Sequence, residues 1–174
     1  MEEARFSNQL NKKKSEYTTG FFMFQGNAVI SIDEKGRVII PAKFRRHIPP
    51  EAKGIMNITL GRDGCLWLYP SNEWQNLLVL LSSVSSFTAK DKAMKRHILS
   101  HADECSIDSQ HRILLNSNHL EKAGIKNEVL LIGQLELIEL WNPKTYDKYL
   151  KSQKDSYEDV MEEVMTRIQS QKQG

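Results

Sequence analysis

An internal repeat constrains this chain more than any other feature of its sequence. The segment Ser31–Ile40 recurs as Ser106–Leu115, so that Ser-Ile-Asp, an arginine and three aliphatic residues return 75 residues later. Further along, the offset falls to 72, which indicates three extra residues in the first copy, near Pro49-Pro50. Two copies in one order predict one structural unit built twice. The later matches are Leu60-Gly61 with Ile132-Gly133, Leu66–Tyr69 with Ile138–Trp141, and Trp74 with Tyr146.

Each copy reads as two strands, a short helix and two more strands. In the first copy, the apolar stretches Val29–Ile32 and Val38–Ile40 flank a polar turn, which predicts a hairpin. Gly36 in that turn is suited to a positive φ angle. His111 stands at the matching position of the second copy and adopts such an angle less easily. Pro41 is well placed in the first turn of the helix that follows.

The later parts of the two copies also agree. In the second copy, Asn116 or Ser117 is predicted to cap a helix that ends at Gly124. Arg62–Gly64 is predicted to be a turn between two strands. The remaining predicted strands are Met56–Leu60, Cys65–Tyr69, Val129–Ile132 and Leu135–Trp141.

Helices are predicted between the copies and after the second one. Ser71 can cap a helix that runs to Val84, and another is expected over Ala89–Ala102. The tryptophans Trp67, Trp74 and Trp141 are expected to fill the core. A 3.6-residue apolar stripe predicts a C-terminal helix whose apolar face docks on the body of the protein or contacts a neighbouring subunit. The stripe consists of Tyr157, Val160, Met161, Val164, Met165 and Ile168.

Charge is concentrated in one place. The whole chain has 24 Lys and Arg against 22 Asp and Glu, yet the stretch Lys35–Arg46 holds five bases and no acid. Such a local patch attracts phosphate backbones, although a solvated helix face would show the same composition. The five bases, our candidate DNA contacts, are Lys35, Arg37, Lys43, Arg45 and Arg46.

These residues resemble a known family. The stretch Asp33–Arg45 resembles the hairpin of AbrB-type transition-state regulators. Two tandem Asp-x-x-x-Arg motifs, Asp33 to Arg37 and Asp108 to Arg112, narrow the resemblance to the MraZ family of bacterial transcriptional regulators. The resemblance covers about residues 23–150, and it also includes Met23–Gly26, Leu66–Pro70 and Ile132–Gln134.

The resemblance implies both a fold and a function. The expected fold is α+β: two tandem AbrB-like swapped-hairpin halves form a pseudo-two-fold β-barrel, flanked by helices. The expected function is sequence-specific binding of double-stranded DNA at direct repeats in a promoter, with repression of the protein's own cell-division and cell-wall operon. The expected assembly is a homo-oligomeric ring. Mapped onto this chain, the family's DNA contact falls on Lys35 and Arg37.

The two arginines of the motifs invite different interpretations. A planar guanidinium at a hairpin end suits a guanine edge or a phosphate, which favours Arg37 as a DNA contact. An ion pair with Asp33 is the structural alternative for Arg37, and both roles can coexist. The second copy lacks the neighbouring lysine and the glycine, so we expect Asp108 and Arg112 to be structural or interfacial.

Four segments are expected along the chain. Residues 23–100 hold the first repeat and its helices and carry the DNA contact, residues 101–150 hold the second repeat, and residues 151–174 form the amphipathic helix. Residues 1–22 fall outside the resemblance. We interpret them as a flexible, dispensable extension or as a mispredicted start, with Met23 the native initiator.

Other function classes find little support in the sequence. His97, His101, Asp103 and Cys105 could begin a zinc site, but no second pair completes it at the usual spacing, so no metal is expected. No Gly-x-Ser-x-Gly, P-loop or dinucleotide-binding glycine pattern appears, so no cofactor or enzymatic activity is expected. No apolar run suits a membrane span. Two cysteines and the absence of a secretory segment favour a cytoplasmic protein. The resemblance to DNA-binding regulators further implies association with the nucleoid. The alternatives are a single-class AbrB-type regulator or antitoxin, and a scaffold that binds an acidic protein.

Overall fold

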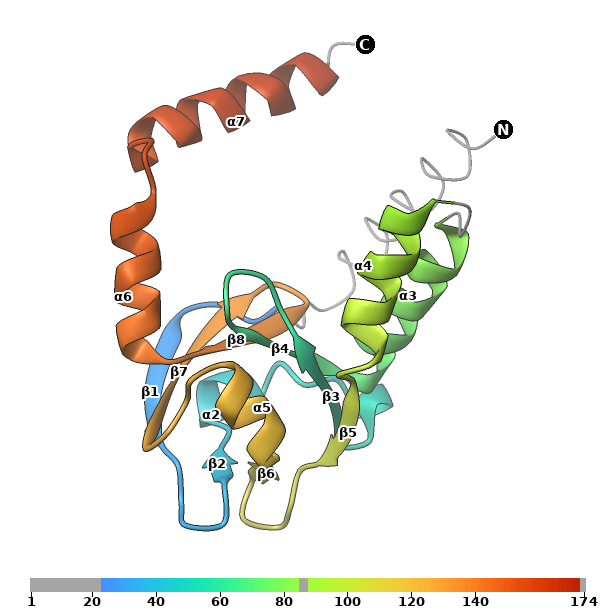
Figure 1. The fold of residues 1–174 in the computed structure, drawn as a ribbon, viewed down its shortest axis with the longest axis vertical. Helices are drawn as coiled ribbons and strands as arrows, with labels where there is room; N and C mark the ends of the chain where they lie inside the picture. Colours follow the sequence, from blue (N-terminus) through green and yellow to red (C-terminus); the bar gives the residue numbers. More distant parts are fainter. Residues whose placement is uncertain (1–22, 85–87, 173–174) are drawn as a thin grey trace. The chain divides into compact units, whose positions relative to one another are not determined.

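The computed structural model describes residues 23–84 and 88–172 and divides the chain at Pro143 (Figure 1). The extension at 1–22 lies outside the described residues. The body up to Pro143 holds both repeats, and a C-terminal unit begins at Lys144. Each of these two units is described by itself.

The first repeat has the predicted order of strands and a short helix, followed by two longer helices. A single 3-10 turn at Pro50–Ala52 takes up the extra residues beside Pro49. The elements are β1 (Asn27–Ser31), β2 (Arg37–Ile39), α2 (Ala42–Arg45), β3 (Ile55–Leu60), β4 (Leu66–Pro70), α3 (Ser71–Ser83) and α4 (Ala89–Leu99).

The second repeat follows the same order. Asn116 caps its helix by accepting a hydrogen bond from the backbone N–H of His119 at 2.8 Å, and Gly124 lies just past the helix end with φ +62°. Both features were predicted. The elements are β5 (Asp103–Ser106), β6 (Arg112–Leu114), α5 (Ser117–Lys122), β7 (Glu128–Gln134) and β8 (Leu137–Trp141).

The first two strands of each repeat pair with strands of the other repeat, whereas β3 with β4 and β7 with β8 pair within their own repeats, as predicted. β1 pairs with β7, and β2 pairs with β6, all antiparallel. The prediction that Val29–Ile32 and Val38–Ile40 form a paired hairpin is therefore wrong at the level of hydrogen bonding, since only the turn between them closes. Pairing across the repeats covers strand edges that each repeat alone would leave open. This interleaving agrees with the swapped-hairpin fold that the resemblance implies.

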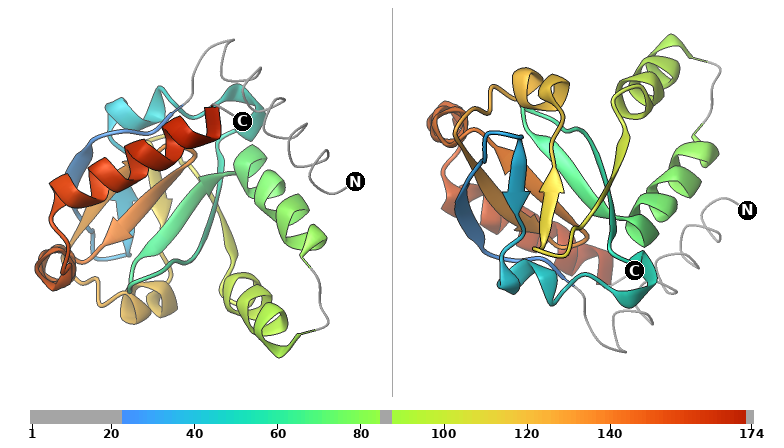
Figure 2. Two further views of the ribbon diagram at one scale, coloured as in Figure 1. Left: turned by 90° about the horizontal axis from the view of Figure 1, so that it is seen from above. Right: turned by 90° about the horizontal axis from the view of Figure 1, so that it is seen from below.

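Two sheets result among the described residues. One has six strands in the order β1-β7-β8-β4-β3-β5, and the other is the β2-β6 ladder. Figure 2 shows β2 and β6 side by side when the body is seen from below. The ladder extends past its strand ends, since Ile40 N–H donates to His111 O and Leu115 N–H donates to Gly36 O, each at 2.9 Å. Each loop therefore meets the end of the other repeat's strand.

The core lies between the ladder and the large sheet. Val38 and Ile113, which face each other in the ladder, are each 1% exposed and join a cluster of buried side chains from both repeats. Phe24 and Phe44 pack edge to face in that cluster, with 6.3 Å between ring centroids. Neither repeat encloses this core alone, so the two halves fold as one body.

A second apolar cluster attaches α3 and α4 to the body. Tyr69, Trp74, Leu81, Ile98 and Leu137 are all buried there. Thr59 also donates its hydroxyl to the carbonyl of Ile98 at 2.5 Å, which joins the end of α4 to β3. Trp74 and Trp141 are buried as predicted, while Trp67 is only half-buried against this cluster.

Three predicted boundaries change. Ser71 is the first residue of α3 rather than its cap, and its hydroxyl donates to Ala52 O at 3.1 Å. α4 ends at Leu99 rather than Ala102, because Asp103 already pairs with Ile58 in the sheet. β8 begins at Leu137, because Leu135 has φ +62° and belongs to a turn.

The C-terminal unit contains α6 (Pro143–Ser152), apart from its first residue, and α7 (Tyr157–Lys172). The predicted apolar stripe is present on α7, and five of its six side chains are exposed; Val164 is half-buried. Whether the body or a neighbouring subunit covers this stripe stays a prediction. Within the residues that the structure describes, no helix has the length and apolar character to span a membrane.

The interleaved strands predict that neither repeat folds alone as a monomer. Residues 23–100 and 101–174, prepared separately, each lack the partners of their first two strands. We expect no cooperative thermal unfolding from either fragment as a monomer, and recovery of the full chain's circular dichroism on mixing. Sedimentation measurements would identify self-paired dimers of one fragment. A monomeric fragment that unfolds cooperatively would contradict the interleaved fold.

Candidate nucleic-acid interface

The turn between β1 and β2 is organised by the carboxylate of Asp33. One oxygen, Oδ1, accepts hydrogen bonds from the backbone N–H groups of Lys35 and Arg37, each at 2.9 Å. The backbone closes the same turn, since Gly36 N–H donates to Asp33 O at 2.9 Å and Asp33 N–H to Arg37 O at 3.0 Å. A short acidic side chain suits this place because it can bind backbone groups two residues on. The turn is therefore rigidly defined.

The other oxygen of Asp33 holds the arginine. Arg37 Nε donates to Asp33 Oδ2 at 2.7 Å. The ion pair that we considered as the structural alternative for Arg37 is therefore present. It fixes one edge of the guanidinium against the turn, and a guanidinium carries five N–H donors, so this bond uses only one of them.

The second repeat reproduces the turn. Asp108 Oδ1 accepts from the backbone N–H groups of Gln110 and Arg112, each at 2.9 Å, and Oδ2 accepts from Arg112 Nε at 2.9 Å. His111 has φ +63° where Gly36 has +78°, so the histidine adopts the conformation that we expected it to adopt less easily. Asp108 and Arg112 thus form an ion pair within their own turn, and their assignment as structural or interfacial residues stays a prediction.

The two arginines differ in how fully the aspartates engage them. Arg112 brings both Nε and Nη2 within 2.9 Å of Asp108 Oδ2, and its side chain is 21% exposed. Arg37 is 31% exposed and is bound through Nε. Arg37 is therefore the more accessible of the two guanidinium groups.

Both aspartates are stabilised in their ionised form. The pKa of Asp33 lies below its ordinary value, chiefly because the Arg37 backbone N–H donates to the carboxylate, with a further contribution from the Arg37 side chain. The pKa of Asp108 is lowered by the same pair of bonds from Arg112. Both turns are therefore charged and closed at neutral pH.

The ladder presents a second feature of the surface beside the arginines. Alternation along β2 and β6 buries Val38 and Ile113 and turns Arg37, Ile39, Arg112 and Leu114 outward. Ile39 is 51% exposed and lies opposite Arg112, while Leu114 is 56% exposed and lies opposite Arg37. Our sequence reasoning assigned Ile39 and Leu114 only to strands. Their alternation with a buried neighbour was the signal that they face solvent.

The structure separates the five candidate bases. Lys35 is exposed within the first turn, directly before Gly36. Lys43 instead donates to the carbonyl of Asn27, at the far end of β1 from that turn. A five-residue strand spans about 13 Å at about 3.3 Å per residue, so Lys43 does not share the position of Lys35.

The remaining two bases lie at the end of α2. Arg45 is half-buried, and its Nε has no hydrogen-bond partner among the described residues. Arg46 is exposed at the C-terminal cap of the helix. The basic run is thus continuous in sequence and divided in space into a turn group, Lys35 with Arg37, and a group on and beside α2.

The histidines and cysteines show structural contacts. His97 and His101 lie with ring centroids 5.8 Å apart, and no group of three or more side chains suited to a metal ion occurs in the described part of the chain. Burial raises the pKa of the Cys65 and Cys105 thiols to about 12, so both are protonated at neutral pH.

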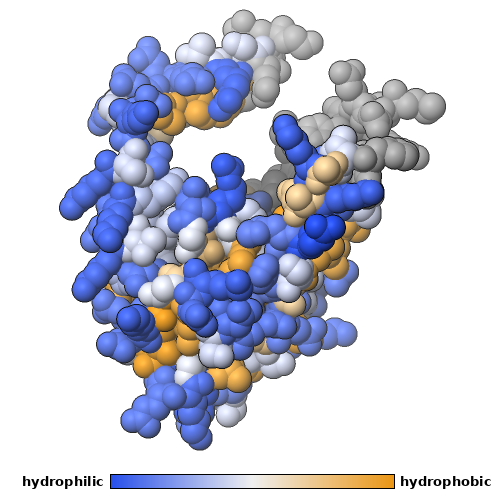
Figure 3. All heavy atoms as spheres, viewed as in Figure 1, coloured by the Kyte–Doolittle hydropathy of each residue, from blue (hydrophilic) through white to orange (hydrophobic). Residues whose placement is uncertain are grey.

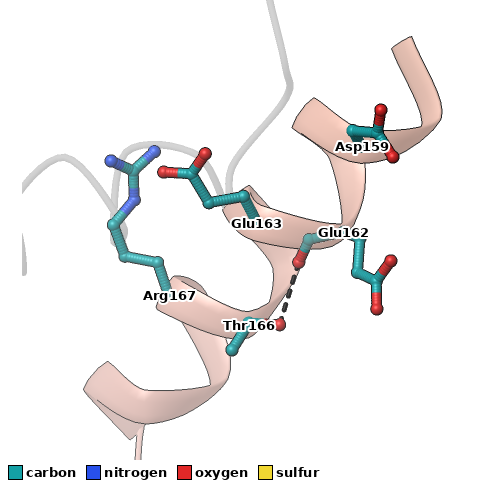
Figure 4. A pocket seen from close by; sticks show the side chains of 5 residues that line it. All are labelled: Asp159, Glu162, Glu163, Thr166 and Arg167. Carbon is teal, nitrogen blue, oxygen red and sulfur yellow. Dashed lines mark hydrogen bonds between the residues drawn. The ribbon is translucent and has the colours of Figure 1, made fainter. Parts of the chain in front are cut away.

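A depression along α7 is lined by side chains of that helix alone (Figure 4). The figure shows carboxylates, the Arg167 guanidinium and Thr166, whose hydroxyl donates to Glu162 O at 2.9 Å. These groups carry no nucleophile paired with a base. We take the ladder with its two turns as the candidate functional surface of the described residues.

Comparison with known proteins agrees with the tandem repeat. The family described as "MraZ protein, putative antitoxin-like" matches residues 23–97 and again residues 98–168. A protein of Serratia proteamaculans (strain 568) named "Transcriptional regulator MraZ" is 34% identical over 148 residues, which cover 84% of this chain and 97% of that protein. Proteins with the same name from Yersinia pestis (strain Pestoides F) and Yersinia pseudotuberculosis serotype O:1b (strain IP 31758) are 33% identical over the same shares.

We expect a substitution at the positive-φ position to change the stability of the protein much more in the first turn than in the second. A Cβ at Gly36 would lie 2.8 Å from the backbone oxygen of Leu115, and the position has φ +78°. Gly36→Ala should therefore lower the free energy of unfolding by about 1–3 kcal/mol. His111→Gly, the matched control, should change it by less than about 1 kcal/mol. Equal losses in urea unfolding would contradict this assignment.

The two kinds of hydrogen bond that Asp33 accepts from Arg37 predict that removing the arginine side chain will raise the Asp33 pKa only in part. Arg37→Ala removes the side-chain donor to Asp33 and keeps the stronger backbone N–H, so the Asp33 pKa should rise but stay below its ordinary value. The pKa of Asp108 should not change. Because folding lowers these pKa values, the stabilisation is present above the unfolded-state pKa and is lost as pH falls through the folded value. Carboxyl NMR shifts against pH would measure it, and an unchanged Asp33 pKa would exclude the side-chain contribution.

Proposed function

The chain belongs to the MraZ family, and from this premise we propose that it is a transcriptional regulator that binds double-stranded DNA through the first turn. The relatives that cover nearly all of this chain's two repeats carry the name of a transcriptional regulator. The contact itself falls on Lys35 and Arg37. It is a binding function, and it requires no cofactor.

The observation that supports this proposal is the presentation of Arg37. Asp33 holds the guanidinium through Nε at 2.7 Å, and the rest of the group lies at an accessible edge of the ladder. An arginine that is already oriented loses less side-chain freedom on binding and can pair with the two acceptors of a guanine edge. The ion pair with Asp33 therefore supports a DNA contact rather than competing with it.

We assign the neighbouring side chains to two kinds of DNA contact, with the phosphate backbone and with the bases. Lys35, beside Arg37 and exposed, supplies a charge for the phosphate backbone. Ile39 and Leu114 project from the same face of the ladder and suit contact with thymine methyl groups. Lys43, Arg45 and Arg46 lie around α2, and we assign them to more distant phosphates. Sequence reading is thus assigned to the ladder and affinity to the bases around it.

The second turn is expected to contribute less. Arg112 is held by two nitrogens, and Gln110 stands where the first repeat has Lys35. The structure nevertheless gives both turns one backbone geometry, so the difference is one of charge and exposure. Arg112 is therefore a support for the DNA contact rather than an equal half of it.

The wider features follow from the family. We propose that the sites are direct repeats in the promoter of the protein's own cell-division and cell-wall operon, that binding represses it, and that the protein acts in the cytoplasm on the nucleoid. A homo-oligomeric ring would place several turns on successive repeats, and linked sites raise the effective concentration of each contact.

A titration with DNA tests the proposal. Fluorescence anisotropy would compare the gene's own upstream duplex with a scrambled duplex at two salt concentrations. Arg37→Ala should weaken binding to the native duplex by about 1–3 kcal/mol and reduce the preference for it. Lys35→Ala should weaken both duplexes and lower the slope of log K against log salt by about 1. Arg112→Ala, the matched control, should lose less affinity for the native duplex than Arg37→Ala does.

Two outcomes would contradict the proposal. Equal, strongly salt-dependent binding to both duplexes would mean that the basic residues bind DNA only through nonspecific charge attraction. It would favour the alternative in which the protein is a scaffold that binds an acidic protein. An equal loss from Arg112→Ala and Arg37→Ala would assign recognition to both turns. An antitoxin of the single-copy type would instead require a partner toxin, and the two repeats of this chain favour the regulator.

A further inference from the structure

We propose that α7 of one copy packs along α4 of a neighbouring copy, and that this contact joins the copies head to tail. The proposal rests on the oligomeric part of the proposed function and not on DNA binding. It concerns two helix faces that are exposed, opposite in charge and matched in spacing.

The outer face of α4 is basic with an apolar end. Ile98 anchors the helix in the second apolar cluster, and the side of α4 away from that cluster is turned to solvent. Lys92, Arg96 and Leu99 line one flank of this exposed side, all three are exposed, and Leu99 is 45% exposed. The one acid of α4, Asp91, is engaged at the N-terminus, where its backbone N–H and carboxylate both bind the Thr88 hydroxyl.

The face of α7 has the complementary character. Figure 3 shows an orange, apolar band on α7 bordered by blue, hydrophilic residues. The first two turns, Tyr157–Glu163, carry four acids and no base. The 3.6-residue period places Glu158 and Glu162 along one border of the band, next to Met165, which is 51% exposed. At the other border Figure 4 shows Glu163 and Arg167 on the same side of the helix, so that border carries one charge of each sign.

The two faces share one spacing. Lys92, Arg96 and Leu99 follow each other at intervals of four and three residues, and so do Glu158, Glu162 and Met165. Parallel packing brings Lys92 to Glu158, Arg96 to Glu162 and Leu99 to Met165, with the apolar band closing against the side of α4. Side chains four apart on a helix lie about 5–6 Å apart, so both ion pairs can form at once. Antiparallel packing would set a base against the methionine.

Charge also favours α4 over another α7 as the partner. Parallel pairing of two α7 helices would bring the four acids of each copy together, and antiparallel pairing would offer few bases. α4 supplies the exposed bases Lys90, Lys92 and Arg96, while Lys95 donates to the carbonyl of Val84 in its own chain. A contact between two different surfaces is heterologous, and such contacts repeat from copy to copy and close into a ring when the rotation allows.

Reciprocal charge reversal in the full-length protein tests this contact. One variant is Lys92→Glu with Arg96→Glu, and the other is Glu158→Lys with Glu162→Lys. Each should bring like charges together between copies. In light scattering during size exclusion at about 0.15 M salt, where such charges still interact, we expect the mass to fall from the multimer of the wild type to 20.1 kDa. Circular dichroism would verify that each variant is folded.

Mixing the two variants gives the decisive result. In an equal mixture the acidic α4 of one variant meets the basic α7 of the other, and each copy also offers its unchanged helix. We expect the multimer to return on mixing. A contact of α7 with α4 of its own chain would not be restored in this way, because each variant repels within itself.

The control and the contrary outcomes separate this proposal from the others. Lys122→Glu with Lys126→Glu makes the same change of charge on exposed residues at the end of α5 and in the loop after it, and should leave the multimer intact. A multimer that survives reversal of α4, or two variants that do not reassemble on mixing, would overturn the α4–α7 contact. A monomeric wild type would overturn the oligomer itself, whereas loss of DNA binding in Arg37→Ala at unchanged mass would leave the contact standing.

Discussion

The antiparallel pairing of β2 with β6 is the constraint on which the rest of the body depends. It places the buried residues Val38 and Ile113 opposite each other and sets Gly36 and His111 against the ends of the other repeat's strand. Because β1 also pairs across, with β7, neither repeat closes a core alone. The same pairing brings both Asp-x-x-x-Arg turns onto one ladder, and so it builds the core and the candidate interface in one step.

Each turn is then fixed by a single carboxylate. In both Asp33 and Asp108, one carboxylate oxygen accepts hydrogen bonds from backbone N–H groups and the other accepts one from an arginine side chain. The distances are nearly equal in the two repeats. The two turns share one backbone geometry but differ in their side chains, because Lys35 and Gly36 in the first turn are replaced by Gln110 and His111 in the second. A chain that joins both repeats covalently can differ between its turns in a way that two identical subunits cannot.

Most of the local geometry of the candidate site could be predicted from the sequence. The turn, its positive φ at Gly36 and the Asp33–Arg37 pair follow from residue types and spacing, because these interactions are local. Ile39 and Leu114 were missed as surface residues, since exposure depends on which face of a strand the other repeat covers. The five bases also looked like one patch, whereas β1 separates Lys43 from Lys35 by its own length.

The sequence by itself determined the repeat, the order of strands and helices, the caps at Asn116 and Gly124, and the turn chemistry. These depend on contacts between near neighbours in the chain, and residue type predicts such contacts well. Only the tertiary structure decided which strands pair, where α4 ends, where β8 begins, and which bases share a surface. Strand pairing between residues some 75 positions apart is chosen by burial of the common core, and no local pattern carries that information.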